Sequence, residues 1–402
     1  NEGKYNHVFV ASISDDISKA KDLLDGQKFD TPQKPSGGSE DFIWSSDSSQ
    51  LLYVCKKKSG KEYATSTNTD IYTFDLASGK TENITEGMMG YDVNPKFSPD
   101  GKSLLWQSMA RDGYEADKND VVVMDWVSKK KTNLTKNWDE SVVGDVAWSN
   151  DSKMIYFTTA KRGTKQFFAL NPKDAKVNQI SDGAFDVNEI VAFQNDFAFV
   201  TRTDINHNAD LFKLNLKDGT MLQITQVNKE NYANLTPSKS ELKMVKTSDG
   251  KEMGVWFHYP PNFDPNKKYP TLLYCQGGPQ SALTQYFSTR WNFALMAANG
   301  YIVVAPNRRG MPGWGTKWNE DISKDWGGQP MRDYIAAADF AKTLPFVDGS
   351  RMGAVGASYG GYSVFMLAGI HENRFKTFIA HDGLFDMKSW YGTTEELWFA
   401  NW

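Results

Sequence analysis

The chain has 402 residues, a length that allows at least two hydrophobic cores. Its formal net charge of −4 leaves no excess of basic residues, which argues against nucleic acid as a partner. No apolar run approaches the roughly 18 residues that a bilayer span needs, so no membrane partner is expected.

Two short phrases recur through the first half of the chain. The first ends in aspartate, recurs every 45 to 53 residues and precedes an apolar, strand-like run: Trp44-Ser45-Ser46-Asp47, Phe97-Ser98-Pro99-Asp100, Trp148-Ser149-Asn150-Asp151 and Phe193-Gln194-Asn195-Asp196. The second alternates with it: Asn83-Ile84-Thr85, Asn133-Leu134-Thr135, Gln179-Ile180-Ser181 and Gln223-Ile224-Thr225. Such a period, with several short strands per unit, is typical of propeller blades. We therefore predict about four blade units of a partial β-propeller over residues 1–235, with a generic β-sandwich as the alternative.

The second half of the chain alternates strand and helix patterns. A polar stretch over 228–239 separates the halves, and the boundary is placed near Leu235. Strands are predicted over 271–275, 301–305, 352–355 and 375–380, and helices over 291–299, 330–344 and 361–370. This alternation predicts a doubly wound parallel sheet over residues 236–402.

A nucleophile elbow is the most informative motif of the chain. Gly356-Ala357-Ser358-Tyr359-Gly360 lies between a predicted strand and a predicted helix, the context in which a Gly-x-Ser-x-Gly pattern carries meaning. In such a turn the serine is strained and its hydroxyl is exposed, while the glycines let strand and helix approach closely. The motif predicts Ser358 as the nucleophile of an α/β-hydrolase.

A nucleophilic serine also needs two donors for the oxyanion that forms on its substrate. The backbone N–H of Tyr359 directly follows the nucleophile, and the second donor is expected from the loop after the first core strand, Gln276-Gly277-Gly278. We favour the Gly278 N–H, with Gln276 or Gly277 as neighbours that shape the hole. A glycine turn that serves only chain reversal is the alternative.

These features together resemble a known family. A propeller followed by a hydrolase domain with Gly277-Gly278-Pro279, Arg309-Gly310 and the elbow is similar to the prolyl oligopeptidase family of serine peptidases. Within it, Ala380-His381-Asp382-Gly383 and residues 394–402 look most like the dipeptidyl-peptidase 5 and acylaminoacyl-peptidase branch. The resemblance implies a serine exopeptidase that acts on short peptides and releases dipeptides, with no cofactor. It also implies a periplasmic or secreted location and allows a homodimer.

The catalytic triad is not complete in the sequence. In α/β-hydrolases the acid and the histidine follow the serine on later strands, and only 44 residues follow Ser358. His371 and His381 come too early for that order, so a catalytic role is expected for neither. A structural role is favoured for His381, with a place lining the cleft as the alternative. We therefore expect the chain to be a fragment, with the triad Asp and His beyond its end and further blades before its start.

Substrate-binding residues are only partly indicated by the sequence. The resemblance implies acidic propeller residues that hold a free amino terminus, for which Glu140, Asp139 and Glu115 are candidates. Ordinary solvated acids are the alternative. The apolar residues Phe385, Met387, Trp390 and Tyr391 could form the wall of a pocket for the residue before the cleaved bond, or could be core.

Other chemistries have weaker support in the sequence. No Cys/His cluster has metal-ligand spacing, and Cys55 and Cys275 fall in different predicted domains, so a disulfide is not expected. An esterase on the same scaffold and a non-catalytic propeller that binds proteins are the two alternative functions. The elbow serine argues against the second.

Overall fold

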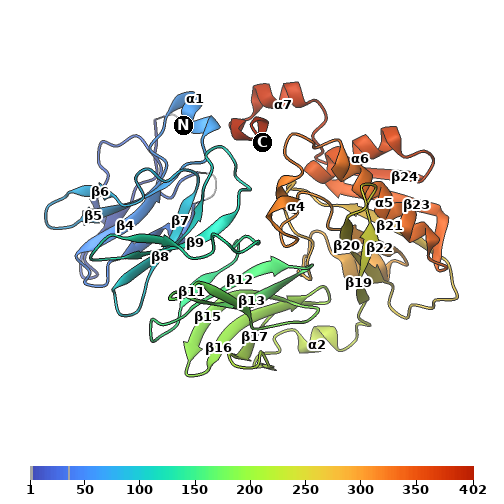
Figure 1. Ribbon diagram of the computed structural model, residues 1–402, viewed down its shortest axis with the longest axis horizontal. Helices are drawn as coiled ribbons and strands as arrows, with labels where there is room; N and C mark the ends of the chain where they lie inside the picture. The colour runs from blue at the N-terminus through green and yellow to red at the C-terminus, as the bar shows by residue number, and fades with distance from the viewer. Residues whose placement is uncertain (1–2, 35–36) are drawn as a thin grey trace.

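The computed structural model describes residues 3–34 and 37–402, and Figure 1 shows them as a set of β sheets followed by a mixed α/β half. The N-terminal segment contains η1 (Ile17–Lys19), η2 (Ser39–Asp41) and the short antiparallel pair β1 (Phe9–Val10) and β2 (Lys21–Asp22). Within the described residues, no helix is long and apolar enough to cross a membrane.

Residues 42–223 form four antiparallel sheets in which each strand pairs with the next (Figure 1). Their strands are β3 (Phe42–Trp44), β4 (Gln50–Cys55), β5 (Asp70–Asp75) and β6 (Thr81–Asn83); β7 (Asp92–Phe97), β8 (Ser103–Met109), β9 (Asn119–Asp125) and β10 (Lys131–Asn133); β11 (Val146–Trp148), β12 (Ile155–Lys161), β13 (Thr164–Asn171) and β14 (Lys176–Gln179); β15 (Asp186–Gln194), β16 (Phe197–Asp204), β17 (His207–Asn215) and β18 (Met221–Gln223). The prediction of four blade units is confirmed for this segment. Neighbouring blades share buried side chains, as Leu52, Trp106 and Val122 do in one cluster.

The first repeated phrase forms the turn between the first and second strands of a blade. In the first blade, the Ser45 hydroxyl donates to Asp47 at 2.7 Å and accepts from the Gln50 amide at 2.9 Å. These bonds hold the pKa of the exposed Asp47 carboxyl down at about 2, chiefly through the Ser45 hydroxyl. The repeat therefore reflects a side-chain-bonded turn that each copy with a Ser and an Asp can form.

The second repeated phrase ties the last strand of each blade to the strand before it. The Thr85 hydroxyl donates to Asp70 at 3.0 Å and accepts from the Ile71 amide, and Thr135 does the same with Asp120 and Val121. Ser181 and Thr225 repeat this arrangement in the third and fourth blades. The recurring hydroxyl residue thus has a structural reason in all four sheets.

The second half is built on one six-stranded sheet with the order β19-β20-β22-β21-β23-β24. Its strands are β19 (Lys239–Lys246), β20 (Glu252–Tyr259), β21 (Tyr269–Cys275), β22 (Ile302–Pro306), β23 (Val347–Ala357) and β24 (Thr377–His381). The last four are parallel, as predicted, whereas β19 and β20 are antiparallel and were not predicted. The boundary predicted near Leu235 falls between β18 and β19 and stays a prediction.

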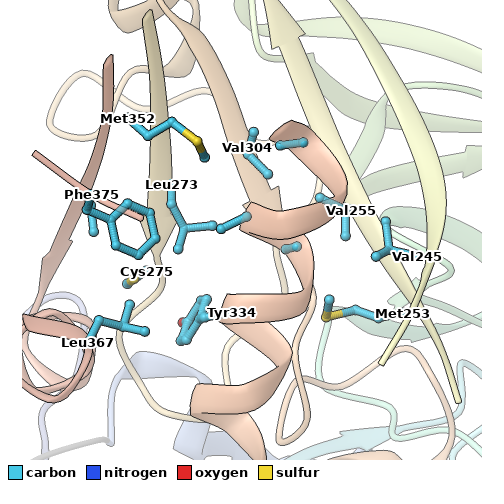
Figure 2. Close-up of a cluster of buried hydrophobic side chains, with 14 of the residues drawn as sticks. Val245, Met253, Val255, Leu273, Cys275, Val304, Tyr334, Met352, Leu367 and Phe375 are labelled. Atoms are coloured by element: carbon cyan, nitrogen blue, oxygen red, sulfur yellow. The ribbon is translucent and has the colours of Figure 1, made fainter. Parts of the chain in front are cut away.

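Helices cover both faces of this sheet. They are α3 (Phe293–Ala298), α5 (Gln329–Thr343) and α6 (Tyr359–Ile370). The short helices α4 (Thr316–Glu320), α7 (Met387–Thr393) and η3 (Leu397–Ala400) also belong to this half, while α1 (Gly60–Thr65) and α2 (Lys229–Tyr232) lie outside it. Figure 2 shows the core beneath α5 and α6, where Tyr334 and Leu367 meet Leu273 and Cys275 of β21. On the opposite face, Phe293 and Ala297 of α3 pack with Val303 and Ala305. Cys55 and Cys275 are both buried and free, as expected.

Several hydrogen bonds join the propeller to the hydrolase half. The Arg162 amide donates to Gly313 O at 2.8 Å, and the Trp256 indole donates to Gly163 O at 2.9 Å. Asp186 of β15 accepts from the Thr284 hydroxyl. These contacts place propeller residues beside the loops that follow the hydrolase strands.

Candidate active site

Ser358 lies at the junction between β23 and α6. Its backbone has φ 57° and ψ −123°, a conformation that a residue with a side chain adopts only under strain. The Ser358 amide donates to His381 O of β24 at 3.0 Å, which fixes the turn to the neighbouring strand. The side chain is exposed, so the hydroxyl can meet a substrate.

The glycines around Ser358 are required by close backbone packing. A Cβ on Gly360 would lie 2.0 Å from the carbonyl oxygen of Cys275, and one on Gly356 would lie 2.5 Å from the same atom. A Cβ on Gly361 would lie 2.5 Å from the Cα of Gly383. Because real Cβ atoms do not come this close to backbone, the elbow can form only with glycine at these positions.

The loop predicted to supply the second oxyanion donor lies against the nucleophile. The Cβ position of Gly277 is 3.5 Å from the Cβ of Ser358, and Gly278 is exposed with φ 122°, which favours glycine. The amides of Gly278 and Tyr359 have no hydrogen-bond acceptor among the described residues. The Gln276 side chain donates to Ser281 at 3.3 Å, so it braces the loop from within. Two unused amides therefore lie close to Ser358, as an oxyanion hole requires.

The two histidines near Ser358 in sequence make other contacts. His381 Nε2 lies 2.9 Å from an Asp382 carboxylate oxygen, and its ring packs edge-on to Trp291. His371 Nδ1 accepts from the Phe375 amide at 3.3 Å. Within residues 3–34 and 37–402, the Ser358 hydroxyl has no hydrogen-bond partner.

A cavity of about 230 Å³ lies between the propeller and the oxyanion loop. The hydrolase half contributes Gly278 and Gln280 to its wall, and the propeller contributes Met109 and Glu115. Phe399 of η3 completes this wall and also lines two neighbouring cavities. The cavity joins the candidate oxyanion hole to propeller side chains.

One of these neighbouring cavities, of about 360 Å³, is acidic. Glu115 and Met109 line it as well, together with the carboxylates of Glu40, Asp41 and Glu396. Burial raises the pKa of Glu115 to about 7 and that of Asp41 to about 6. Carboxylates so placed could bind the cationic end of a substrate when ionised.

Glu140 and Asp139, unlike Glu115, form hydrogen bonds to a loop of the hydrolase half. Glu140 accepts a hydrogen bond from the Gly315 amide at 3.2 Å, and Asp139 accepts from the Thr316 amide and hydroxyl. Burial raises the pKa of Glu140 to about 7. Both acids thus bind the loop that begins α4, and a role for Glu140 in substrate binding stays a prediction.

The predicted apolar pocket residues are separated in the structure. Met387, Trp390 and Tyr391 line a third cavity, of about 380 Å³, with Phe399. Phe385 is 79% exposed and packs edge-on to Phe365 of α6. The structure therefore brings Trp390 and Tyr391 to a cavity that shares Phe399 with the candidate site, and leaves Phe385 outside it.

Sequence reasoning missed three residues that hold the site. Arg308, Tyr114 and Asp186 each bond to the 276–285 loop from positions distant in sequence, so no local pattern could indicate them. Among the described residues, no group of three or more His, Cys, Asp or Glu side chains could hold a metal ion.

Comparisons with known proteins agree with this arrangement. Residues 41–256 match the TolB beta propeller domain, and residues 286–402 match the prolyl oligopeptidase family. The chain is 49% identical over 397 residues to dipeptidyl-peptidase 5 of Porphyromonas gingivalis, covering 98% of this chain and 58% of that protein. It is 47% identical to dipeptidyl-peptidase 5 of Porphyromonas endodontalis, covering 98% and 57%. The chain thus spans less than two thirds of the length of these relatives.

Solved structures share the fold at lower identity. Acylaminoacyl peptidase of Pyrococcus horikoshii superposes with a TM-score of 0.75 at 21% identity, covering 90% of this chain and 55% of that one. Dipeptidyl peptidase 4 of Porphyromonas gingivalis superposes with a TM-score of 0.63 at 18% identity, covering 89% and 49%. A propeller followed by an α/β-hydrolase half is therefore the fold of this chain.

Proposed function

This chain belongs to the TolB beta propeller domain family, and on that premise we propose that it is part of a serine peptidase of the prolyl oligopeptidase family that releases dipeptides from the amino terminus of short peptides. The observation that carries the proposal is the exposed, strained Ser358 beside the unbonded amides of Tyr359 and Gly278. Two relatives at 47% and 49% identity are dipeptidyl-peptidases, which supports the choice of reaction.

Ser358 acts as the nucleophile in this proposal. Its oxygen attacks the scissile carbonyl to form an acyl-enzyme, and the amides of Tyr359 and Gly278 stabilise the oxyanion of the tetrahedral intermediate. The hydroxyl needs a histidine base and an acid that orients it. We propose that both lie outside this chain, because His371 and His381 are bonded elsewhere.

The substrate is held from the propeller side. When a dipeptide is released, only two residues lie between the cleaved bond at Ser358 and the amino terminus of the substrate, so the ammonium group stays near the site. Glu115 lines both the cavity beside Gly278 and the acidic cavity next to it. We favour Glu115 over Glu140 for the ammonium group, because Glu140 is bonded to Gly315. Trp390 and Tyr391 are proposed to contact an apolar side chain before the cleaved bond. A periplasmic or secreted location is proposed from the family alone.

A substrate panel tests the proposed reaction. The full-length protein is given dipeptidyl, acyl-amino-acid and simple ester substrates that carry the same leaving group. We expect the highest kcat/KM for the dipeptidyl substrate with a free amino terminus, and loss of that preference when the amine is acetylated. Turnover of esters alone would contradict the peptidase proposal and favour an esterase on the same scaffold.

A further inference from the structure

Arg308 is a completely buried arginine that lies directly beneath the candidate oxyanion loop. It follows β22 by two residues and is 0% exposed. Its guanidinium donates to Pro279 O at 2.8 Å, to Gln276 O at 3.3 Å and to Arg309 O at 2.7 Å. Its Nε donates to the Tyr334 hydroxyl at 3.1 Å. The first two acceptors bracket Gly277 and Gly278.

The charge of Arg308 is not paired with a carboxylate anywhere in the described part of the chain. The adjacent Arg309 shows the ordinary arrangement, since it forms ion pairs with Asp249 and Asp333. A buried cation without a counter-ion is costly unless its N–H groups are well bonded. Two of the oxygens that accept hydrogen bonds from Arg308 belong to Gln276 and Pro279, at the two ends of the loop beside Ser358. These bonds stabilise the buried charge and restrain the loop.

Arg308 also contacts the second half of the oxyanion hole. Its guanidinium carbon lies 4.7 Å from the ring centroid of Tyr359, within the range of a cation–π contact. The Tyr359 ring is buried, and its hydroxyl donates to Trp326 O at 2.7 Å. One side chain therefore touches Tyr359, which supplies one expected oxyanion donor, and the two residues that flank Gly277 and Gly278, where the other is expected.

This arrangement matters because oxyanion holes depend on donors that are fixed before the reaction. Glycine has the widest range of backbone conformations, so Gly277 and Gly278 need an external restraint to keep one amide in place. Hydrogen bonds from a planar guanidinium to the flanking carbonyls supply such a restraint. The unpaired positive charge also favours the negative charge that develops close by.

We propose that Arg308 is a positioning residue for the oxyanion hole, which it holds through the carbonyls of Gln276 and Pro279 and through the ring of Tyr359. The proposal rests on the hydrolytic function of Ser358 proposed above. It predicts that Arg308 acts on the chemical step far more than on substrate binding.

The test compares Arg308→Met, Arg308→Lys and Tyr334→Phe in the full-length protein. The Met variant keeps an unbranched side chain that can fill part of the buried space and removes every donor, whereas the Lys variant keeps the charge and one bonding group. Tyr334→Phe removes the one side-chain hydrogen-bond partner of Arg308 among the described residues and leaves both loop carbonyls bonded. Circular dichroism and thermal unfolding establish that each variant is folded.

Kinetics on matched oxo-ester and thiono-ester substrates give the decisive readout. A fixed oxyanion hole discriminates against the larger sulfur atom, and a loosened hole does so less. We expect Arg308→Met to lower kcat on the oxo-ester by about ten- to a hundredfold, with KM within about threefold, and to reduce the oxo/thiono preference. Arg308→Lys should recover part of both, and Tyr334→Phe should retain the wild-type preference.

Two results separate the failure of this inference from that of the proposed function. If wild-type protein hydrolyses the oxo-ester but folded Arg308→Met keeps both its kcat and its oxo/thiono preference, the positioning role is wrong. If Arg308→Met does not fold, an unchanged preference in folded Arg308→Lys contradicts the role in the same way. If the wild-type protein hydrolyses neither ester nor peptide, the proposed function is wrong and the inference falls with it.

Discussion

The carboxylate of Asp186, the first residue of β15, accepts a hydrogen bond from the Thr284 hydroxyl at 2.5 Å and another from the Gln285 amide at 3.1 Å. Asp186 is 1% exposed, and it also accepts from the Lys165 amide within the propeller. Gln280 of the same loop donates to the hydroxyl of Tyr114 in the propeller. The loop that begins at the candidate oxyanion hole is thus held at two points by the other half of the chain.

Replacing Asp186 with Asn should weaken the contact between the two halves. The amide keeps the shape of the carboxylate but turns a donor toward groups that are themselves donors, so we expect a loss of about 1–3 kcal/mol in the free energy of unfolding. Chemical denaturation measures this loss. Asp196→Asn is the matched control, because Asp196 lies in the same blade, is 60% exposed and pairs with exposed Lys217, and it should change the stability by no more than about 0.5 kcal/mol. Equal effects of the two substitutions would contradict this account.

Replacing Gly360 with Ala should disrupt the elbow. The new Cβ would lie 2.0 Å from Cys275 O, so α6 must move away from β21, at a cost of about 1–3 kcal/mol or more, with loss of activity. Gly369→Ala is the control in the same helix, since a Cβ there meets nothing within 4 Å. It should stabilise the helix by up to about 1 kcal/mol and leave activity unchanged. Thermal unfolding and peptide turnover measure both, and an active, stable Gly360→Ala variant would refute the close packing.

The pH dependence of KM should report on Glu115. Burial raises the pKa of its carboxyl from 4.5 to about 7, so the group is largely protonated and neutral below pH 7 and anionic above it. Because an ammonium group is attracted to the anion, KM for a dipeptidyl substrate should fall as the pH rises through about 7. Glu115→Gln should raise KM about tenfold at pH 8, have little effect at pH 6 and flatten this pH dependence.

Glu140→Gln is the informative comparison for that experiment. Its carboxyl pKa is also raised to about 7 by burial, but the group is bonded to Gly315. If the Glu140 variant raises KM and the Glu115 variant does not, the assignment of the two acids is reversed. If neither does, the acidic cavity does not bind the substrate amine.

The fold was readable from the sequence where its signals are local. The blade turns recur because each is made by residues two to five apart, such as Ser45, Asp47 and Gln50. The parallel strands are short apolar runs buried on both faces, as β22 is. β19 was not predicted because its residues are mostly polar and partly exposed, as an edge strand allows. Its pairing with β20 gives it a structure that its own composition does not indicate.

The sequence likewise predicted those parts of the candidate site that depend on local motifs. Ser358 and the Tyr359 amide belong to one five-residue motif, so the sequence alone places them together. Arg308 and Pro279 are 29 residues apart in sequence, and Tyr114 and Gln280 are 166 apart. No repeat or motif in the sequence indicates either contact. Glu115 and Glu140 look alike in sequence, and they are distinguished only by what each contacts after folding.

Fluorophosphonate labelling of the full-length protein, followed by mass spectrometry of its peptides, tests the central claim most directly. A fluorophosphonate reacts with an activated serine whose oxyanion hole can hold the phosphoryl oxygen. We predict a single adduct on Ser358, which Ser358→Ala abolishes while the protein stays folded. No adduct on Ser358 in a folded protein, or an adduct on another residue that Ser358→Ala leaves unchanged, would contradict the assignment of Ser358 as the nucleophile.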